Sequence, residues 1–251
     1  MEAPIAAGMP PSSTDARILR IPGLDAEPGL VHGFSTLPLG NMSPPGPGAD
    51  PRTPQRRAFA DALGLDAALL TAAGAVHGAE VARVDAPAGV VRGSDAVVTD
   101  RLGLPLLATF ADCYPLVLFD PRRRALALVH TGWRGTAAGL AARAVRALEA
   151  GFGCRPRDLV AGVGPGICGR CYEVGDEVAG QFDPAVVRPS PGGPGRSLLD
   201  LAAANRAQLE EAGVPAGSIH AHGACTRESA ALPSHRRSPD GVRFACIAAI
   251  R

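Results

Sequence analysis

Eight short apolar runs constrain this fold more than any other feature of the sequence. Each has the length and composition of a β-strand, and they lie at 30–34, 81–85, 95–100, 104–110, 114–120, 124–131, 159–164 and 242–250. Helical periodicity is confined to 56–65, 136–152, 174–182 and 198–213. Because the strands come in runs and do not alternate strictly with helices, the pattern predicts an α+β fold, a layered sandwich, instead of a doubly wound sheet.

Two segments rich in proline and glycine interrupt the pattern, at 43–54 and 183–197. Such composition is typical of flexible loops. Neither segment separates regions of different composition, so neither is expected to be a domain linker. The sequence therefore predicts a single domain over 1–251, with about 1–16 disordered and both segments flexible.

All 25 basic residues are arginine, which excludes chemistry that needs a lysine. Neither a Schiff base nor a Walker phosphate loop can form, so any anion must be bound by arginine, whose planar guanidinium suits phosphate. The net charge is +1 and aromatic residues make up 4% of the chain. Both numbers argue against a nucleic-acid partner.

The N-terminus, MEAPIAAGMPPSSTDAR, lacks the basic start and long apolar stretch of a signal peptide. No uncharged run approaches the ~20 residues that cross a bilayer. The six cysteines are therefore expected to be thiols or metal ligands and not disulfides. These features predict a cytoplasmic protein with no membrane partner, and they leave its oligomeric state open.

Three residues with side chains that favour zinc stand at edges of predicted strands: His77, Cys113 and His130. Two imidazoles and one thiolate suit Zn2+, and three protein ligands leave a fourth position for a water whose pKa falls to about 7. Spacings of 36 and 17 residues match no local metal motif. From the residues alone, Cys113 could equally be a small buried apolar side chain.

Other interpretations of the cysteines stay open. Cys113 and His130 could be the nucleophile and base of a hydrolase that uses no metal. Cys168 and Cys171, in CGRC, could be a redox pair or part of a structural zinc site, although no second CxxC exists. A binding module in which zinc only holds the fold is disfavoured, because structural sites usually have four protein ligands.

Seven motifs follow one another from about residue 30 to the C-terminus: HGFST (32–36), VHG (76–78), ADCYPLVLFD (111–120), VHTGWRG (129–135), GPGICGRCYEV (164–174), ACT (224–226) and SHRR…GVRF (234–244). In this order they resemble the YfiH-like family, also called the polyphenol oxidase or laccase-domain family and, more recently, purine nucleoside phosphorylase. The resemblance implies an α-β-β-α sandwich, zinc held by His77, Cys113 and His130, and a purine nucleoside substrate. It implies phosphorolysis of adenosine, inosine or methylthioadenosine to the free base and ribose-1-phosphate, and deamination of adenosine to inosine.

Phosphorolysis needs a phosphate site and contacts to the nucleoside. Arg134 lies on a turn before the predicted helix 136–152, whose N-terminus would add backbone donors to an anion contact. Asp112 is a candidate general acid or base, or a carboxylate that orients a histidine ligand, the role that we favour. Trp133 is a candidate wall for the base. The second cationic cluster, for the substrate, comprises Arg236, Arg237 and Arg243. Purely structural roles stay open for all of these except Asp112.

Leu37 and Pro38 depart from the family pattern, because many relatives carry an arginine and glycines at that point. A phosphate contact there would have to come from Arg52, Arg56 or Arg57.

Oxidation by several coppers, the activity in the family's older name, needs many histidines in paired motifs. The chain has six histidines and one His-x-His pair, His220 and His222. We therefore reject a multi-copper site.

Overall fold

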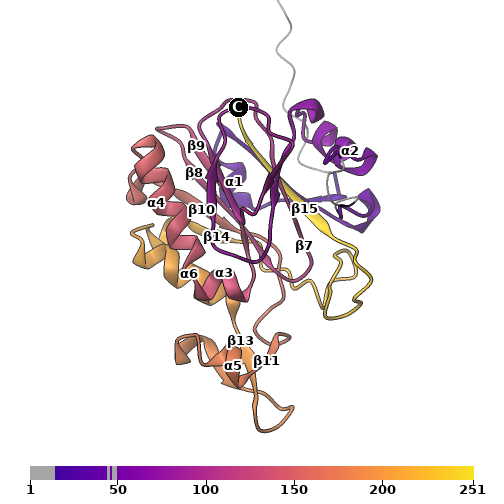
Figure 1. Ribbon diagram of the computed structural model, residues 1–251, viewed down its shortest axis with the longest axis vertical. Coiled ribbons are helices and arrows are strands. Elements are labelled where there is room, and N and C mark those ends of the chain that lie inside the picture. The colour runs from indigo at the N-terminus through magenta and orange to yellow at the C-terminus, as the bar shows by residue number, and fades with distance from the viewer. Residues whose placement is uncertain (1–14, 44–45, 47–49) are drawn as a thin grey trace, which may run out of the picture.

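The computed structural model describes residues 15–43, 46 and 50–251. Within them, two six-stranded sheets lie at the centre and a three-stranded sheet extends from one end (Figure 1). The expected disorder at about 1–16 falls almost entirely outside the described residues, as does part of the 43–54 loop. Both expectations stay predictions.

The first sheet has the strand order β1-β2-β15-β7-β3-β5. Its strands are β1 (Ile18–Leu19), β2 (Leu30–Ser35), β3 (Thr71–Gly74), β5 (Val90–Arg92), β7 (Leu106–Phe110) and β15 (Phe244–Ile250). The first four strands in this order, β1, β2, β15 and β7, pair antiparallel. Strand β3 runs parallel to both of its neighbours, β7 and β5.

The second sheet has the order β14-β10-β8-β9-β6-β4. Its strands are β4 (Val81–Arg83), β6 (Ala96–Thr99), β8 (Tyr114–Asp120), β9 (Ala125–Thr131), β10 (Val160–Val163) and β14 (Ile219–Ala221). The inner pairs are antiparallel, and the two edge strands pair parallel. The third sheet is antiparallel and contains β11 (Glu173–Gly175), β12 (Val187–Pro189) and β13 (Arg196–Leu199).

The α-helices are short. They are α1 (Pro22–Asp25), α2 (Pro54–Ala62), α3 (Trp133–Ala137), α4 (Leu140–Phe152), α5 (Asp176–Ala179) and α6 (Leu201–Glu211). Single 3-10 turns lie at Leu37–Leu39, Ala67–Leu69, Pro156–Asp158, Pro184–Val186 and Ala216–Ser218. In the part of the chain that the structure describes, no helix is long and apolar enough to cross a membrane.

Strand β8 packs on one face against the first sheet and on the other against the helices α4 and α6. Its alternate residues Val117 and Phe119 belong to the apolar cluster that also contains Phe34 and Phe244 of the first sheet. Leu116 and Leu118 belong instead to the cluster that includes side chains of α4 and α6. Because both faces of this strand are covered, its sequence from Pro115 to Phe119 is apolar and does not alternate. On the other side of the molecule, α2 packs on the first sheet.

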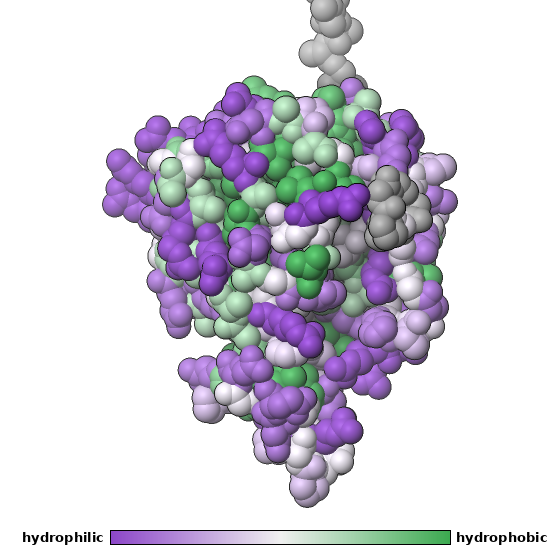
Figure 2. Space-filling view, viewed as in Figure 1, coloured by the Kyte–Doolittle hydropathy of each residue, from purple (hydrophilic) through white to green (hydrophobic). Residues whose placement is uncertain are grey.

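Figure 2, in the same view, shows hydrophilic residues over most of the helical layer and the protruding third sheet. Apolar residues appear mainly in the upper centre of this view, over the central strands. This distribution agrees with a mixed α/β domain whose apolar clusters are centred on the two large sheets.

The structure differs from the sequence prediction at two helices. Residues 136–152 do not form one helix, because Gly139 adopts a left-handed conformation (φ 73°) that ends α3 and precedes α4. Residues 174–182 were expected to be helical, but β11 occupies their start and α5 only four of them. The segment 183–197 contains β12 and the start of β13; its flexibility stays a prediction.

Candidate active site

Strand pairing brings the three predicted zinc ligands together. Cys113 immediately precedes β8, and His130 is the last residue but one of β9. These strands are antiparallel with Pro115 opposite His130, so the start of one meets the end of the other. His77 lies in the loop between β3 and β4, at the same edge. One ligand atom from each of the three residues lies within 4.8 Å of the others.

The backbone around these residues leaves room for an ion. A Cβ at Gly132 would lie 2.9 Å from Cys113 Sγ and 3.4 Å from the His77 ring, so only glycine keeps the space between them open. His77 and Asp112 have positive φ angles of 60° and 85°, which are uncommon for residues other than glycine. Backbone strain of this kind persists where the surroundings enforce it, often at functional sites.

Asp95 holds two of the ligands in position. Its Oδ1 lies 3.1 Å from His130 Nδ1, which leaves Nε2 of that ring to face the other ligands. The same carboxylate accepts backbone hydrogen bonds from Val76, His77 and Gly78, at 3.2, 2.9 and 2.7 Å. A carboxylate behind a ligand histidine fixes its tautomer and raises its basicity. Asp95 therefore fits the role of a positioning residue for the candidate metal site.

Cys113 and His130 stabilise each other's charged form in the metal-free protein. Burial alone would raise the pKa of the Cys113 thiol, but hydrogen bonds and charges from His130 and His77 outweigh it and lower that pKa to about 6. Burial would lower the pKa of His130, but Asp95 and Cys113 raise it to about 9. A thiolate is thus available at neutral pH, and the chemistry of the donors fits zinc.

Replacing Asp95 by asparagine is expected to weaken zinc binding by about 10- to 100-fold. Asparagine has one acceptor oxygen, so it cannot hold His130 and three backbone N–H groups as a carboxylate does. Competition with a chromogenic chelator measures the affinity. Asp61→Asn, on the exposed face of α2, is the matched control and should bind zinc as the wild type does. Unchanged affinity in Asp95→Asn would contradict the positioning role.

The three ligands open onto a cavity of about 1420 Å³. This exceeds the ~300–1,000 Å³ of most small-molecule pockets. Charged lining side chains are mainly basic, with two carboxylates, Asp50 and Asp112. The arginines are Arg52, Arg56, Arg92, Arg134, Arg236 and Arg243. The cavity therefore has room for a substrate with an anionic partner.

Five of the predicted substrate or catalytic residues line this cavity: Asp112, Trp133, Arg134, Arg236 and Arg243. The Arg134 guanidinium carbon lies 4.3 Å from the centre of the Trp133 ring. Arg134 is the second residue of α3, a helix of five residues, and not on a turn before a long helix. The expected contribution of a helix N-terminus to its anion contact stays a prediction.

Arg237 is not among the residues that line the cavity. Its guanidinium donates to the backbone carbonyls of Thr226, Arg227, Ser229 and Leu232. These bonds support the loop in which it lies, so the structure gives no support to a substrate contact. Arg236 lies over the cavity residue Tyr172, with its guanidinium carbon 4.9 Å from the ring centre.

Asp112 does not orient a histidine ligand. Its carboxylate accepts hydrogen bonds from Thr226 Oγ1 at 2.6 Å and from the backbone N–H of Arg236 at 2.8 Å. The histidine partner is Asp95 instead. Being next to Cys113 in sequence does not direct Asp112 toward His130, because the backbone at Asp112 is left-handed (φ 85°) and does not extend strand β8, which begins at Tyr114.

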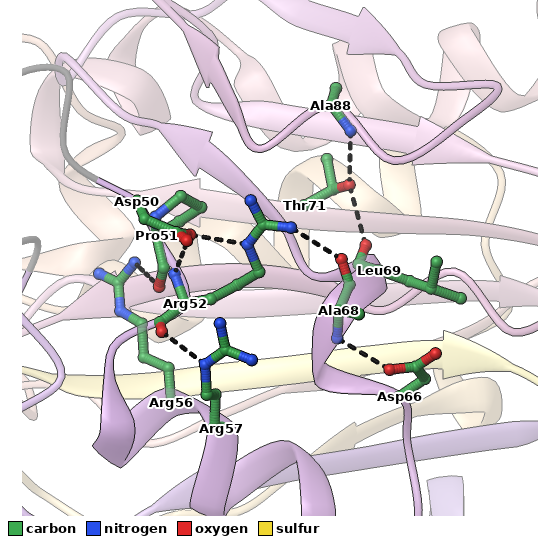
Figure 3. A network of polar contacts seen from close by, with 10 residues as sticks. All are labelled: Asp50, Pro51, Arg52, Arg56, Arg57, Asp66, Ala68, Leu69, Thr71 and Ala88. Atoms are coloured by element: carbon green, nitrogen blue, oxygen red, sulfur yellow. Dashed lines mark hydrogen bonds and ion pairs between the residues drawn. The ribbon is translucent and has the colours of Figure 1, made fainter.

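The arginines near the divergent Leu37 and Pro38 are largely engaged in local contacts (Figure 3). Arg52 Nε lies 2.7 Å from Asp50, and Arg57 donates to the carbonyl of Arg52. Arg56 is buried and donates to the carbonyls of Met42 and Pro51, and burial lowers its pKa to about 10. By contrast, Arg92 and Arg134 have no acceptor among the described residues.

Sequence reasoning missed Asp95, Arg92 and Tyr172. A signal existed for Asp95, because a carboxylate at the start of a buried apolar strand needs polar partners. Arg92 and Tyr172 carried no such signal, and only their position on the cavity identifies them. The structure also adds Cys225 and Glu228 to the cysteines of CGRC, and this group of four is a second set that could bind a metal ion.

Comparisons with known proteins agree with the motifs. Residues 51–250 match the family model described as multi-copper polyphenol oxidoreductase laccase. A protein of Deinococcus radiodurans named purine nucleoside phosphorylase is 40% identical over 234 residues, 88% of this chain and 87% of its own length. A protein named adenosine deaminase RL5, from an unknown prokaryotic organism, is 39% identical over 150 residues, 57% of this chain and 56% of its own.

A similar structure has also been solved. The crystal structure of the hypothetical protein YfiH of Bacillus licheniformis superposes with a TM-score of 0.79 at 27% identity, covering 88% of this chain and 93% of that one. Family model, sequence relatives and solved structure thus point the same way, and the chain belongs to the YfiH-like, multi-copper polyphenol oxidoreductase laccase family.

Proposed function

We propose that this chain is a zinc-dependent purine nucleoside phosphorylase of the cytoplasm, built as an α-β-β-α sandwich, and that it also deaminates adenosine. The observation that carries the proposal is the convergence of His77, Cys113 and His130 on one side of an arginine-lined cavity. The name of the Deinococcus radiodurans relative, which matches 88% of this chain, supports phosphorolysis.

The protein's contribution at the metal is to hold three ligands and leave one position open. His77, Cys113 and His130 would bind the ion, and Asp95 would keep His130 in the tautomer that ligates through Nε2. Zinc with three protein ligands supplies a Lewis acid with a free coordination position. All three ligand residues line the cavity in which the substrate would lie.

Arg92 and Arg134 are the proposed phosphate contacts, because their guanidinium groups lack other acceptors in the described chain. Arg92 ends β5 opposite Gly74, three residues before His77. Phosphate held there would attack ribose C1′ while the bond to the purine nitrogen breaks. The purine leaves with the bonding electrons and takes up a proton, which gives free base and ribose-1-phosphate. Trp133 and Tyr172 offer apolar surfaces for the purine.

Deamination would use the same cavity without phosphate, since water replaces the amino group of adenosine and ammonia leaves. The relative named adenosine deaminase RL5, which matches 57% of this chain, supports this second activity. A hydrolase with Cys113 as nucleophile uses the same residues and remains the competing proposal. Copper oxidation is not proposed, because the chain has only six histidines.

Product analysis tests the proposed function. Adenosine, inosine and methylthioadenosine are each incubated with the protein, with and without phosphate, and the products are separated by liquid chromatography. Free base should form only with phosphate, together with ribose-1-phosphate from adenosine or inosine and 5-methylthioribose-1-phosphate from methylthioadenosine. Inosine should form from adenosine in either case. Release of free base at the same rate without phosphate would rule out phosphorolysis.

Variants of Arg92 and Arg134 sharpen this experiment. Arg92→Gln and Arg134→Gln each remove a charge-assisted contact of about 1.5–3 kcal/mol, so the KM for phosphate should rise roughly 10- to 100-fold. Deamination should change much less, since it uses no phosphate. Arg57→Gln is the matched control, because Arg57 does not line the cavity. An unchanged KM for phosphate in both variants would show that phosphate does not bind at these two arginines.

A further inference from the structure

A group of three cysteines and one glutamate lies outside the candidate active site. Cys168 and Cys171 belong to the loop between β10 and β11, and Cys225 and Glu228 to the loop 222–243 between β14 and β15. One ligand atom from each lies within 4.8 Å of the other three. We name these four residues the thiol cluster. The fold brings together residues that are more than fifty positions apart in sequence.

Contacts within the thiol cluster already resemble a coordination shell. Glu228 Oε1 lies 3.3 Å from Cys171 Sγ and 3.8 Å from Cys168 Sγ. The backbone N–H of Cys168 donates to Cys225 Sγ over 3.3 Å. With zinc–sulfur bonds of ~2.3 Å, ligand atoms of a tetrahedral site are roughly 3.7 Å apart. The observed separations therefore need little adjustment to hold an ion.

The donors select the kind of ion and of site. Thiolates favour zinc over magnesium or calcium, which take oxygen ligands. Four protein ligands fill a tetrahedral shell, and closed sites of this kind are structural, whereas catalytic sites keep a position open. The thiol cluster thus fits a structural metal site, whereas His77, Cys113 and His130 offer three ligands, as catalytic sites do.

The charges around the thiol cluster also suit a cation. Glu228 supplies a carboxylate whose Oε1 faces the sulfurs, and Arg170, 3.2 Å from Oε2 and 3.4 Å from Oε1, holds this carboxylate in place. A divalent ion would replace the thiol protons and neutralise the negative charge.

We propose that Cys168, Cys171, Cys225 and Glu228 bind a second zinc ion, and that this ion fastens the loop 222–243 to the loop before β11. The loop 222–243 contains no helix or strand among the elements described, and it exceeds the ~12–15 residues beyond which such loops are uncommon. A metal link between distant segments offsets the entropy of holding a long loop closed.

Two ligands of the second ion would be adjacent in sequence to residues of the candidate active site. Thr226, next to Cys225, donates to Asp112, and Tyr172, next to Cys171, lines the cavity. The backbone of Thr226 also donates to Gly166 at 3.0 Å. Zinc in the thiol cluster would therefore fix Asp112, Tyr172 and Arg236 relative to one another without touching substrate.

Zinc content tests the proposal without relying on activity. The protein is purified under reducing conditions without chelator, and zinc per chain is measured by mass spectrometry. We expect two zinc ions in the wild type, one in Cys171→Ser/Cys225→Ser, one in His130→Ala, and none when these substitutions are combined. Cys154→Ser, a buried thiol outside both sites, is the matched control and should keep two.

Two measurements on the wild type keep the proposal testable if the double variant does not fold. Thiol titration of the denatured, metal-free protein should find six thiols, and four would indicate a disulfide within the cluster and overturn the proposal. Cobalt-substituted protein should show thiolate-to-metal charge transfer from two distinct sites. A single zinc that is lost entirely in His130→Ala would also refute it, and would leave the proposed function intact.

Discussion

His130→Ala is expected to lose one zinc ion per chain and to reduce nucleoside turnover to the level of the metal-free protein. Two ligands, His77 and Cys113, remain after the change, and two are too few to hold a catalytic zinc. The fold should persist, because Asp95 still accepts three backbone hydrogen bonds. Zinc analysis, circular dichroism and steady-state kinetics on one preparation measure all three effects.

The control for this variant is His220→Ala. His220 lies in the edge strand β14 and is not among the cavity residues, so zinc content and turnover should stay at wild-type levels. If His130→Ala turned over nucleosides like the wild type, the metal site could not be the centre of the chemistry.

Removal of the metal is the second large effect. Dialysis against a strong zinc chelator should abolish turnover, and added Zn2+ should restore it, since the proposed reaction needs the ion beside the substrate. A hydrolase with Cys113 as nucleophile predicts the opposite: stripping the metal frees the thiolate and activity persists or rises. Activity measured before stripping, after it and after reloading therefore separates the two proposals.

Alkylation of Cys113 in the stripped protein gives an independent measurement. Because the pKa of Cys113 is lowered to about 6 in the metal-free state, its thiolate exists above that pH and is lost as the pH falls through it. Iodoacetamide should therefore modify the Cys113 peptide rapidly at pH 7, and bound zinc should protect it. Slow modification that begins only near pH 9 would contradict the lowered pKa.

The apolar runs in the sequence predicted the central strands well. Each of the eight expected runs overlaps a strand of one of the two large sheets. Strands β2, β6, β8, β9 and β15 are buried along their whole length, and a run buried on both faces has a strong compositional signal. Strand β3, with the sequence TAAG, and the short strands β12 and β14 had no such signal. Their pairing depends on neighbours that are distant in sequence.

The helices were predicted less accurately for local reasons. Gly139 divides the segment 136–152 because its left-handed conformation stops one helix and begins the next. Residues 198 and 199 pair with β12 in the third sheet, so α6 begins at Leu201 with Asp200 as its cap. Apolar periodicity alone does not distinguish such a strand end from a first helical turn.

The sequence by itself determined which strands and side-chain types this protein has. The strands are apolar, arginine is the only cationic side chain apart from histidine, and the ligand types suit zinc. It also marked His77, Cys113 and His130 as one set, through their places at strand ends and the family motifs. Their role as metal ligands stays a prediction, but the structure brings their ligand atoms within 4.8 Å of one another.

Only the tertiary structure decided which side chains meet. Antiparallel pairing of β6 with β9 places Ala96 opposite Val129 and so sets Asp95 beside His130, while Asp112 points to Thr226 instead. The same is true of the thiol cluster, which joins CGRC to Cys225 and Glu228. Strand register and loop packing are long-range properties, set by how the whole core closes, and no local pattern of residues contains them.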